Sequence, residues 1–218
     1  MTSKWRVYKF GGTSLKDAAM FQRVADILKA ESSRPLAVVV SAMAGITDAL
    51  MEMGQLAQNG DERYIACVEA ANLRHKEAAE ILLNKTELSS FLTFLSQQMR
   101  DVEDLLRAVA LARHFSEASA DLISGYGELL SARLLTGYLK TSGCSAAFCD
   151  ARDVLRITHQ EVGPVPLWEE SQQRISQWQE DHTEDIWVVT GYIATDEKGA
   201  PTTLKRNGSD YSASIFAA

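Results

Sequence analysis

The sequence predicts an α/β fold with a largely parallel central sheet, and three observations support this prediction. First, a strand, a loop, a helix and a second strand follow one another between Trp5 and Val40. Second, Leu36–Val40 is a continuous apolar run, which is typical of a strand buried on both faces. Third, another apolar run at Ile186–Ala194 follows a long helical region, so strands and helices alternate along the chain.

The first of these units is expected to be a βαβ unit. Trp5–Phe10 is aromatic and β-branched and ends at Gly11, which predicts a strand that enters a tight loop. Apolar residues recur at helical spacing over Asp17–Ala30, so we expect a helix there. Pro35 then opens the strand at Leu36–Val40.

The middle of the chain is expected to be helical because apolar residues recur there at helical spacing among Ala, Leu, Glu and Arg. The predicted helices cover Ile46–Leu56, Glu62–Leu83, Glu87–Phe115 and Glu128–Leu139. The last of them ends at Gly143, a favourable C-terminal signal, and a short strand is expected over Ser145–Cys149.

Towards the end of the chain, Pro164 and Pro166 are expected to break the chain before a helix at Trp168–Gln179. Ile186–Ala194 reads as one strand, and Thr202–Leu204 as a strand that returns after a turn. A helix is expected to follow and to run to Ala218 without a Gly, Pro or other C-cap, which predicts that the chain is a fragment of a longer protein.

Composition excludes several classes of function. The 218 residues carry a net charge of −7, and the 22 Lys and Arg residues are scattered among 29 acids, which argues against a nucleic-acid partner. No window approaches ~18 uninterrupted apolar residues, so we expect no membrane span. The three cysteines and four histidines show no metal-binding spacing, and no targeting segment is recognisable, so a cytoplasmic location is expected.

The segment Lys9–Ser14 is the first candidate for chemistry. Its adjacent glycines, Gly11 and Gly12, let the backbone approach a ligand, and successive N–H groups of Gly11, Gly12, Thr13 and Ser14 could hold an anion. The N-terminus of the following helix would favour phosphate, and Lys9 could reach a transferring phosphoryl group. The alternative is a plain Gly-Gly turn at the end of a strand.

Three further segments also lie where a strand ends or a helix begins. In Ser41–Thr47, the side chains of Ser41 and Thr47 follow a buried strand on the side where ligands bind in open α/β sheets. Glu128 stands at a predicted helix start, where it could bind an ammonium group or simply interact favourably with the helix dipole.

The fourth segment is Thr203–Ala213. Its Arg206 is suited to holding a carboxylate in two places, and Ser209 or Asp210 could N-cap the final helix. The alternative is a surface loop that leads into a capped helix.

Together these segments resemble the ordered motifs of aspartate kinase. Lys-Phe-Gly-Gly-Thr-Ser, Ser-Ala-Met-Ala-Gly-Ile-Thr, Gly-Glu-Leu-Leu-Ser and Leu-Lys-Arg-Asn-Gly-Ser-Asp-Tyr-Ser-Ala occur in the order of that family and span the whole chain. The last motif is most similar to kinase domains fused to homoserine dehydrogenase. The resemblance implies a three-layer αβα amino acid kinase (carbamate kinase-like) fold, truncated before its C-terminal nucleotide-binding half. It implies that residues 1–218 form the aspartate-binding portion.

The resemblance also implies an activity, the transfer of the ATP γ-phosphoryl group to the side-chain carboxylate of L-aspartate. The product, 4-phospho-L-aspartate, begins the route to lysine, threonine and methionine. Lys9 would stabilise the transferring group, helped by the N–H groups of Gly11 and Gly12, and Asp210 would organise Lys9. Arg206 would bind the α-carboxylate of aspartate and Glu128 its ammonium. The pocket would be completed by Ser41, Thr47 and Ser209.

The partners implied by the resemblance are L-aspartate and ATP, with Mg²⁺ held through the nucleotide phosphates and no metal site of the protein's own. The intact protein is expected to be a homo-oligomer. No general base is needed, because a carboxylate with a pKa of about 4 is already ionised at pH 7. Two alternatives stay open: another amino acid kinase, acting on glutamate, acetylglutamate or UMP, and a catalytically silent fragment that at most binds aspartate.

Overall fold

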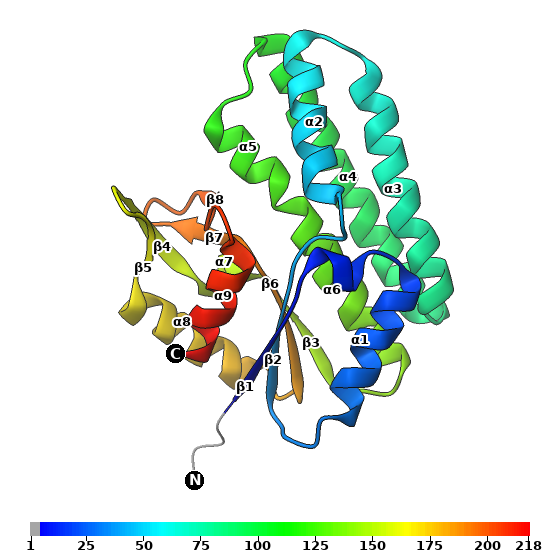
Figure 1. Ribbon diagram of the computed structural model, residues 1–218, viewed down its shortest axis with the longest axis vertical. Coiled ribbons are helices and arrows are strands. Elements are labelled where there is room, and N and C mark those ends of the chain that lie inside the picture. The colour runs from blue at the N-terminus through cyan, green and yellow to red at the C-terminus, as the bar shows by residue number, and fades with distance from the viewer. Residues whose placement is uncertain (1–4) are drawn as a thin grey trace.

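The computed structural model describes residues 5–218 and contains a four-stranded main sheet in which all strands are parallel (Figure 1). Its strands, in the spatial order β1-β2-β6-β3, are β1 (Arg6–Phe10), β2 (Leu36–Val40), β6 (Ile186–Thr190) and β3 (Ala146–Cys149). Every residue of β2 and of β6 is buried, as expected for apolar strands at the centre of a parallel sheet. The predicted α/β class with a parallel sheet is therefore confirmed.

The two faces of the main sheet are covered by helices, which gives the three-layer αβα arrangement (Figure 1). Helices α1 (Ala18–Ala30) and α6 (Tyr126–Thr141) lie on one side, where α6 packs against β2, β3 and β6. Helices α8 (Trp168–Asp181) and α9 (Gly208–Ala217) lie on the other side, where α9 packs against β1 and β2. The short α7 (Ala151–Val154) follows β3.

A helical lobe extends beyond the main sheet (Figure 1). It consists of α2 (Ile46–Asn59), α3 (Arg63–Leu82), α4 (Lys85–Ala112) and α5 (Glu117–Ser124). The single helix predicted over Glu87–Phe115 is wrong at its end, because α4 stops at Ala112 and Arg113 takes a left-handed φ of 53°. Phe115 fills the space above Gly54, and its N–H donates to the Gln58 side chain at 2.6 Å, so tertiary contacts end the helix.

A second, smaller sheet lies beside the main one, in the order β5-β4-β7-β8 (Figure 1). Its strands are β4 (Arg156–Gln160), β5 (Gly163–Pro166), β7 (Ile193–Asp196) and β8 (Pro201–Thr203). Pro164 and Pro166, which were expected to break the chain before the helix at Trp168, lie in β5, an unpredicted strand that pairs antiparallel with β4. The edge position of β5 tolerates proline, which cannot donate a ladder hydrogen bond.

The strand predicted over Ile186–Ala194 is divided between the two sheets. The N–H of Gly191 donates to the carbonyl of Val40 at 2.8 Å, and Tyr192 takes a left-handed φ of 68°. The chain therefore turns at these two residues, between β6 in the main sheet and β7 in the small one. None of the helices within residues 5–218 is both long enough and apolar enough to cross a membrane.

Candidate active site

A cleft of about 580 Å³ opens at the carboxyl ends of β1, β2 and β6. This is the edge at which open α/β sheets bind their ligands. The cleft is lined by Lys9, Gly12, Ser41, Ala42, Met43, Ala44, Gly45, Thr47, Asp48, Glu128, Tyr192, Lys205, Arg206, Asn207, Gly208, Ser209 and Asp210. All four segments singled out in the sequence therefore contribute to one site.

Lys9 reaches the cleft from the end of β1 and forms an ion pair with Asp210 of α9. The Nζ of Lys9 lies 2.9 Å from the Oδ1 of Asp210, and the Lys9 side chain is about a quarter exposed. The ammonium group is therefore held at the rim of the cleft, with solvent on one side.

The glycine segment forms a compact turn. Gly12–Leu15 is a short 3₁₀ helix, η1, and Gly12 lies so close to the next loop that an added Cβ would stand 2.9 Å from the Ala42 carbonyl oxygen. Among residues 5–218, the lining of the cleft includes Gly12 but neither Gly11 nor Thr13 and Ser14.

The helix that follows the glycine segment starts several residues beyond it. Helix α1 begins only at Ala18, and the side chain of Asp17 caps it by accepting from the N–H of Met20. A 3₁₀ turn and a capping carboxylate therefore separate the N-terminus of α1 from the glycines, and its contribution to phosphate binding stays a prediction.

The loop after β2 forms the opposite wall of the cleft. Its backbone is tied to the glycine turn, because the N–H of Ala44 donates to the carbonyl of Gly12 at 3.2 Å. The guanidinium of Arg74 donates to the carbonyl of Ala44 at 2.7 Å from the other side. Gly45 then takes a φ of 80° and leads into α2, which places Thr47 on the cleft.

Glu128 is the most unusual side chain of the site. It lies in the first turn of α6 and is only 3% exposed, and its Oε2 has no hydrogen-bond partner among residues 5–218. Burial raises the pKa of Glu128 to about 8, although backbone hydrogen bonds at Ala42 and Glu128 itself oppose the shift. A buried carboxyl oxygen without a partner, at the wall of a cleft, is suited to receive a cationic ligand group.

The segment between β8 and α9 supplies the third wall. Lys205 and Asn207 both have a left-handed φ of 58°, and Arg206 between them is exposed at the cleft. The prediction that Ser209 or Asp210 caps α9 is wrong, because the N-cap is Asn207 and α9 begins at Gly208. Ser209 and Asp210 thus lie in the first turn, where they face the cleft.

Three helices begin at this cleft, namely α2, α6 and α9. The N-terminus of a helix presents free N–H groups and a partial positive charge, so three of them together favour an anion. The side chains around them carry both signs: Lys9, Lys205 and Arg206 are cationic, and Asp48, Glu128 and Asp210 are acidic. A ligand with negative groups and one positive group fits this pattern.

Four lining residues with polar side chains had no role assigned to them from the sequence: Asp48, Tyr192, Lys205 and Asn207. Asp48 directly follows Thr47 and could have been found by extending that segment one residue. Lys205 and Asn207 flank Arg206, but nothing in the sequence shows that their backbone is left-handed. Tyr192 was missed because the strand end that would have revealed it was placed at Ala194 rather than Thr190.

An α/β domain with a cleft of mixed charge at the carboxyl ends of parallel strands defines a class of proteins that bind small anionic molecules. The family model described as "Amino acid kinase family" matches residues 4–218. The chain therefore belongs to the amino acid kinase family.

Similar proteins include bifunctional aspartokinase/homoserine dehydrogenases. The chain is 36% identical over 215 residues to bifunctional aspartokinase/homoserine dehydrogenase 2, chloroplastic, of Arabidopsis thaliana, covering 98% of this chain and 24% of that protein. It is 34% identical over 217 residues to bifunctional aspartokinase/homoserine dehydrogenase 2 of Escherichia coli K12, covering 98% of this chain and 26% of that protein. The chain thus spans about a quarter of the length of these relatives.

Solved structures of similar fold include Escherichia coli aspartokinase III in complex with aspartate and ADP. That chain is 29% identical and superposes with a TM-score of 0.85, over 97% of this chain and 46% of its own length. The same enzyme in complex with lysine and aspartate gives a TM-score of 0.86 at 28% identity, over 99% of this chain and 47% of its own. These matches confirm the predicted fold.

Proposed function

We propose that this chain is the aspartate-binding portion of an aspartate kinase domain. The enzyme transfers the γ-phosphoryl group of ATP to the side-chain carboxylate of L-aspartate and gives 4-phospho-L-aspartate, the first step towards lysine, threonine and methionine. The observation that carries the proposal is the shared cleft of Lys9, Glu128 and Arg206, which offers one site for an ammonium and two for anionic groups. The names of the relatives and the aspartate and ADP of the matched structure support it.

Each charged group of aspartate has a complementary partner on the cleft. The buried, unpartnered Oε2 of Glu128 receives the ammonium, and the exposed guanidinium of Arg206 binds the α-carboxylate. Ser41, Thr47 and Ser209 contribute hydroxyl groups around the ligand. The side-chain carboxylate then lies towards Lys9.

Catalysis would rest on positioning and charge neutralisation, as in phosphoryl transfer generally. The attacking carboxylate is already ionised at neutral pH, so no base is required. Lys9 neutralises charge on the transferring group, and Asp210, 2.9 Å away, holds the Lys9 ammonium in place. Gly11, Gly12, Thr13 and Ser14 support this end of the site, with Gly12 at the cleft surface.

ATP and Mg²⁺ belong to the proposal as a pair. Mg²⁺ usually binds through substrate phosphates and water, so we expect it to be held here through the phosphates of the nucleotide. The ion would neutralise phosphate charge during transfer. We further propose a homo-oligomeric, cytoplasmic parent protein. The three cysteines, unpaired within residues 5–218, support a reducing compartment, and tagging the parent protein would test the location.

The activity is tested with Lys9→Ala in the full-length protein that contains this chain. We expect aspartate-dependent ADP release in the unchanged protein and a loss in kcat of about 100-fold or more in the variant, because the variant lacks a cation at the developing charge. Lys16→Ala, which removes an exposed lysine paired only loosely with Asp17 at 3.9 Å, is the matched control. Unchanged turnover in Lys9→Ala would contradict the role of Lys9.

A substrate panel separates the alternatives. Preference for acetylglutamate or UMP, which lack the free ammonium that Glu128 would bind, would overturn the choice of aspartate. Calorimetry on the 218-residue chain itself, with aspartate and ATP titrated separately, tests whether it keeps only amino-acid binding. Tight ATP binding would contradict the assignment of the nucleotide half to another segment.

A further inference from the structure

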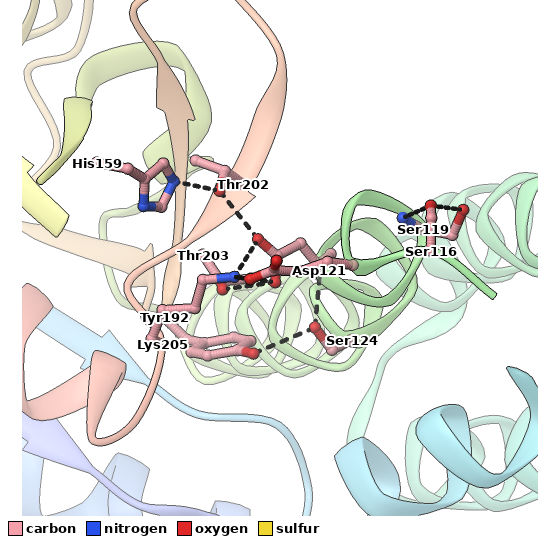
Figure 2. Close-up of polar contacts among 10 residues, drawn as sticks. Ser116, Ser119, Asp121, Ser124, His159, Tyr192, Thr202, Thr203 and Lys205 are labelled. Carbon is pink, nitrogen blue, oxygen red and sulfur yellow. Dashed lines mark hydrogen bonds and ion pairs between the residues drawn. The ribbon is translucent and has the colours of Figure 1, made fainter. Parts of the chain in front are cut away.

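Asp121 of α5 lies at the centre of a polar cluster that includes Lys205, one of the residues that line the cleft (Figure 2). Its two carboxylate oxygens each accept from the Lys205 ammonium at 2.9 Å. They also accept from the hydroxyls of Thr202 at 3.0 Å and Thr203 at 3.1 Å. The Asp121 side chain is only 13% exposed, so these charge-assisted contacts are shielded from water.

A second contact joins α5 to the same region. The hydroxyl of Ser124 donates to the Asp121 carbonyl at 3.1 Å and lies 3.3 Å from the hydroxyl of Tyr192 (Figure 2). The carbonyl of Tyr192 in turn accepts from the N–H of Leu204 at 2.7 Å. Asp121 contacts Thr202, Thr203 and Lys205 directly, and Ser124 contacts Tyr192. Helix α5 therefore holds the residues before Arg206 through these two side chains.

The backbone held in this way is in an unfavourable conformation. Lys205 has a φ of 58°, a region that side chains with a Cβ rarely adopt. Asn207 has the same φ but tolerates it better, because asparagine is one of the residues enriched there. A lysine in this conformation needs support from its surroundings, and its own ammonium provides it through Asp121 and through Glu117 at 2.7 Å.

The consequence reaches the ligand side of the cleft. Lys205, Arg206, Asn207 and Gly208 all line it, and the turn is closed by the N–H of Gly208 donating to the Lys205 carbonyl at 3.0 Å. A shift at Lys205 would therefore move Arg206, the group that binds the α-carboxylate under the proposed function.

We propose that Asp121 is a positioning residue of this site: by binding the Lys205 ammonium, it holds the left-handed backbone that presents Arg206 to the cleft. Asp121 touches no ligand itself and acts through Lys205. The inference rests on the proposed function for the identity of the ligand, but its mechanical part concerns the chain alone.

Rescue by glycine tests the inference, because glycine adopts a positive φ without support. In the full-length protein, Asp121→Asn keeps partners for the two threonines but loses the charge, and we expect the KM for aspartate to rise about tenfold or more with a smaller change in kcat. Lys205→Ala should raise the KM similarly, since alanine keeps a Cβ but lacks the ammonium group that binds Asp121. Lys205→Gly should raise the KM less than Lys205→Ala does. Adding Lys205→Gly to Asp121→Asn should bring the KM much of the way back to that of the unchanged protein.

Limited trypsin digestion provides a readout that does not depend on activity. The bonds after Lys205 and Arg206 should be cut slowly in the unchanged chain and several-fold faster in Asp121→Asn, with circular dichroism unchanged. The bond after Arg206 should be protected again in Asp121→Asn/Lys205→Gly. Asp26→Asn, which removes an exposed ion pair with Lys29, is the matched control and should leave both readouts unchanged.

Equal impairment of Asp121→Asn with and without Lys205→Gly would overturn the inference, because the loss would then not depend on the backbone conformation of Lys205. Wild-type KM and wild-type cleavage in Asp121→Asn would overturn it as well. The unchanged protein could fail to phosphorylate aspartate while digestion still shows faster cleavage in Asp121→Asn and protection in Asp121→Asn/Lys205→Gly. In that case the proposed function fails and the positioning role of Asp121 stands.

Discussion

Stability favours the protonated form of the buried Glu128 carboxyl group, whereas binding of an ammonium group requires its ionised form. Its pKa is raised to about 8 chiefly by burial, so in the ligand-free site it is protonated at neutral pH. An arriving ammonium group needs the ionised form, and binding would therefore release a proton. The charged groups that share the cleft with it are Lys9, Asp48, Lys205, Arg206 and Asp210.

The stability effect of Glu128 follows from linkage. Because its pKa is higher in the folded than in the unfolded chain, the stability it contributes is present below pH 4.5 and is lost as pH rises through about 8. Glu128→Gln should therefore raise the free energy of unfolding at pH 8, by on the order of a few kcal/mol, and change it little at pH 4.5. Denaturant titrations at the two pH values measure this.

The same variant should lose aspartate affinity and the pH dependence of that affinity. In the unchanged protein we expect the Kd for aspartate to fall between pH 6 and pH 8, as the proton on Glu128 becomes easier to release. Glu69→Gln, at an exposed position of α3, is a control that should change neither quantity. A stability profile in Glu128→Gln that parallels the unchanged protein would contradict the raised pKa.

Among the elements, the short turn η1 shows how two neighbouring glycines differ in function. Gly12 packs against the loop before α2, where an added Cβ would meet the Ala42 carbonyl oxygen at 2.9 Å and the Ala44 Cα at 3.3 Å. Gly11 has an ordinary φ of −79°, and its Cβ would meet only the flexible end of Lys9 at 3.4 Å.

Gly12→Ala should therefore destabilise the chain by about 1–3 kcal/mol, because the backbone of the loop cannot move away as a side chain could. Gly11→Ala, the matched control, should stay within about 1 kcal/mol of the unchanged protein. Urea unfolding midpoints of the two variants provide the measurement. Equal midpoints would show that the close approach of η1 to this loop is not maintained in solution.

The elements also show where sequence patterns fail. The βαβ unit and most helices were predictable because apolar periodicity extends over many residues. Helix α5 and strands β4 and β5 were missed, since they are short and their ends depend on partners distant in sequence. The contact of Phe115 with Gly54, which ends α4, joins residues about 60 positions apart and leaves no local signal.

At the scale of the whole molecule, the helical lobe contains a titratable group that affects global stability. His75 of α3 is fully buried, its Nδ1 lies 2.7 Å from the Ala71 carbonyl oxygen, and its Nε2 has no partner among residues 5–218. Burial lowers the pKa of His75 to about 4.

A folded-state pKa below the unfolded value of 6.5 means that the stability is present above pH 6.5 and is lost as pH falls through about 4. His75→Gln should remove up to about 3 kcal/mol of this acid sensitivity, so that the variant unfolds at lower pH. His114→Gln, at an exposed position, should unfold in acid like the unchanged protein. Acid titration followed by far-UV circular dichroism distinguishes them, and coincident curves for His75→Gln and the unchanged protein would contradict the prediction.

For the molecule as a whole, the sequence by itself determined the α/β class, the four segments that meet at one cleft, and the resemblance to aspartate kinase. Local patterns suffice for these features because glycines, helix starts and apolar strands can each be recognised from a few consecutive residues. Only the tertiary structure decided that Glu128 is buried without a partner, that Ile186–Ala194 divides between two sheets, and that Asp121 holds Lys205. Burial, strand ends and ion pairs between distant segments arise from packing, and packing is not encoded in any single stretch of the chain.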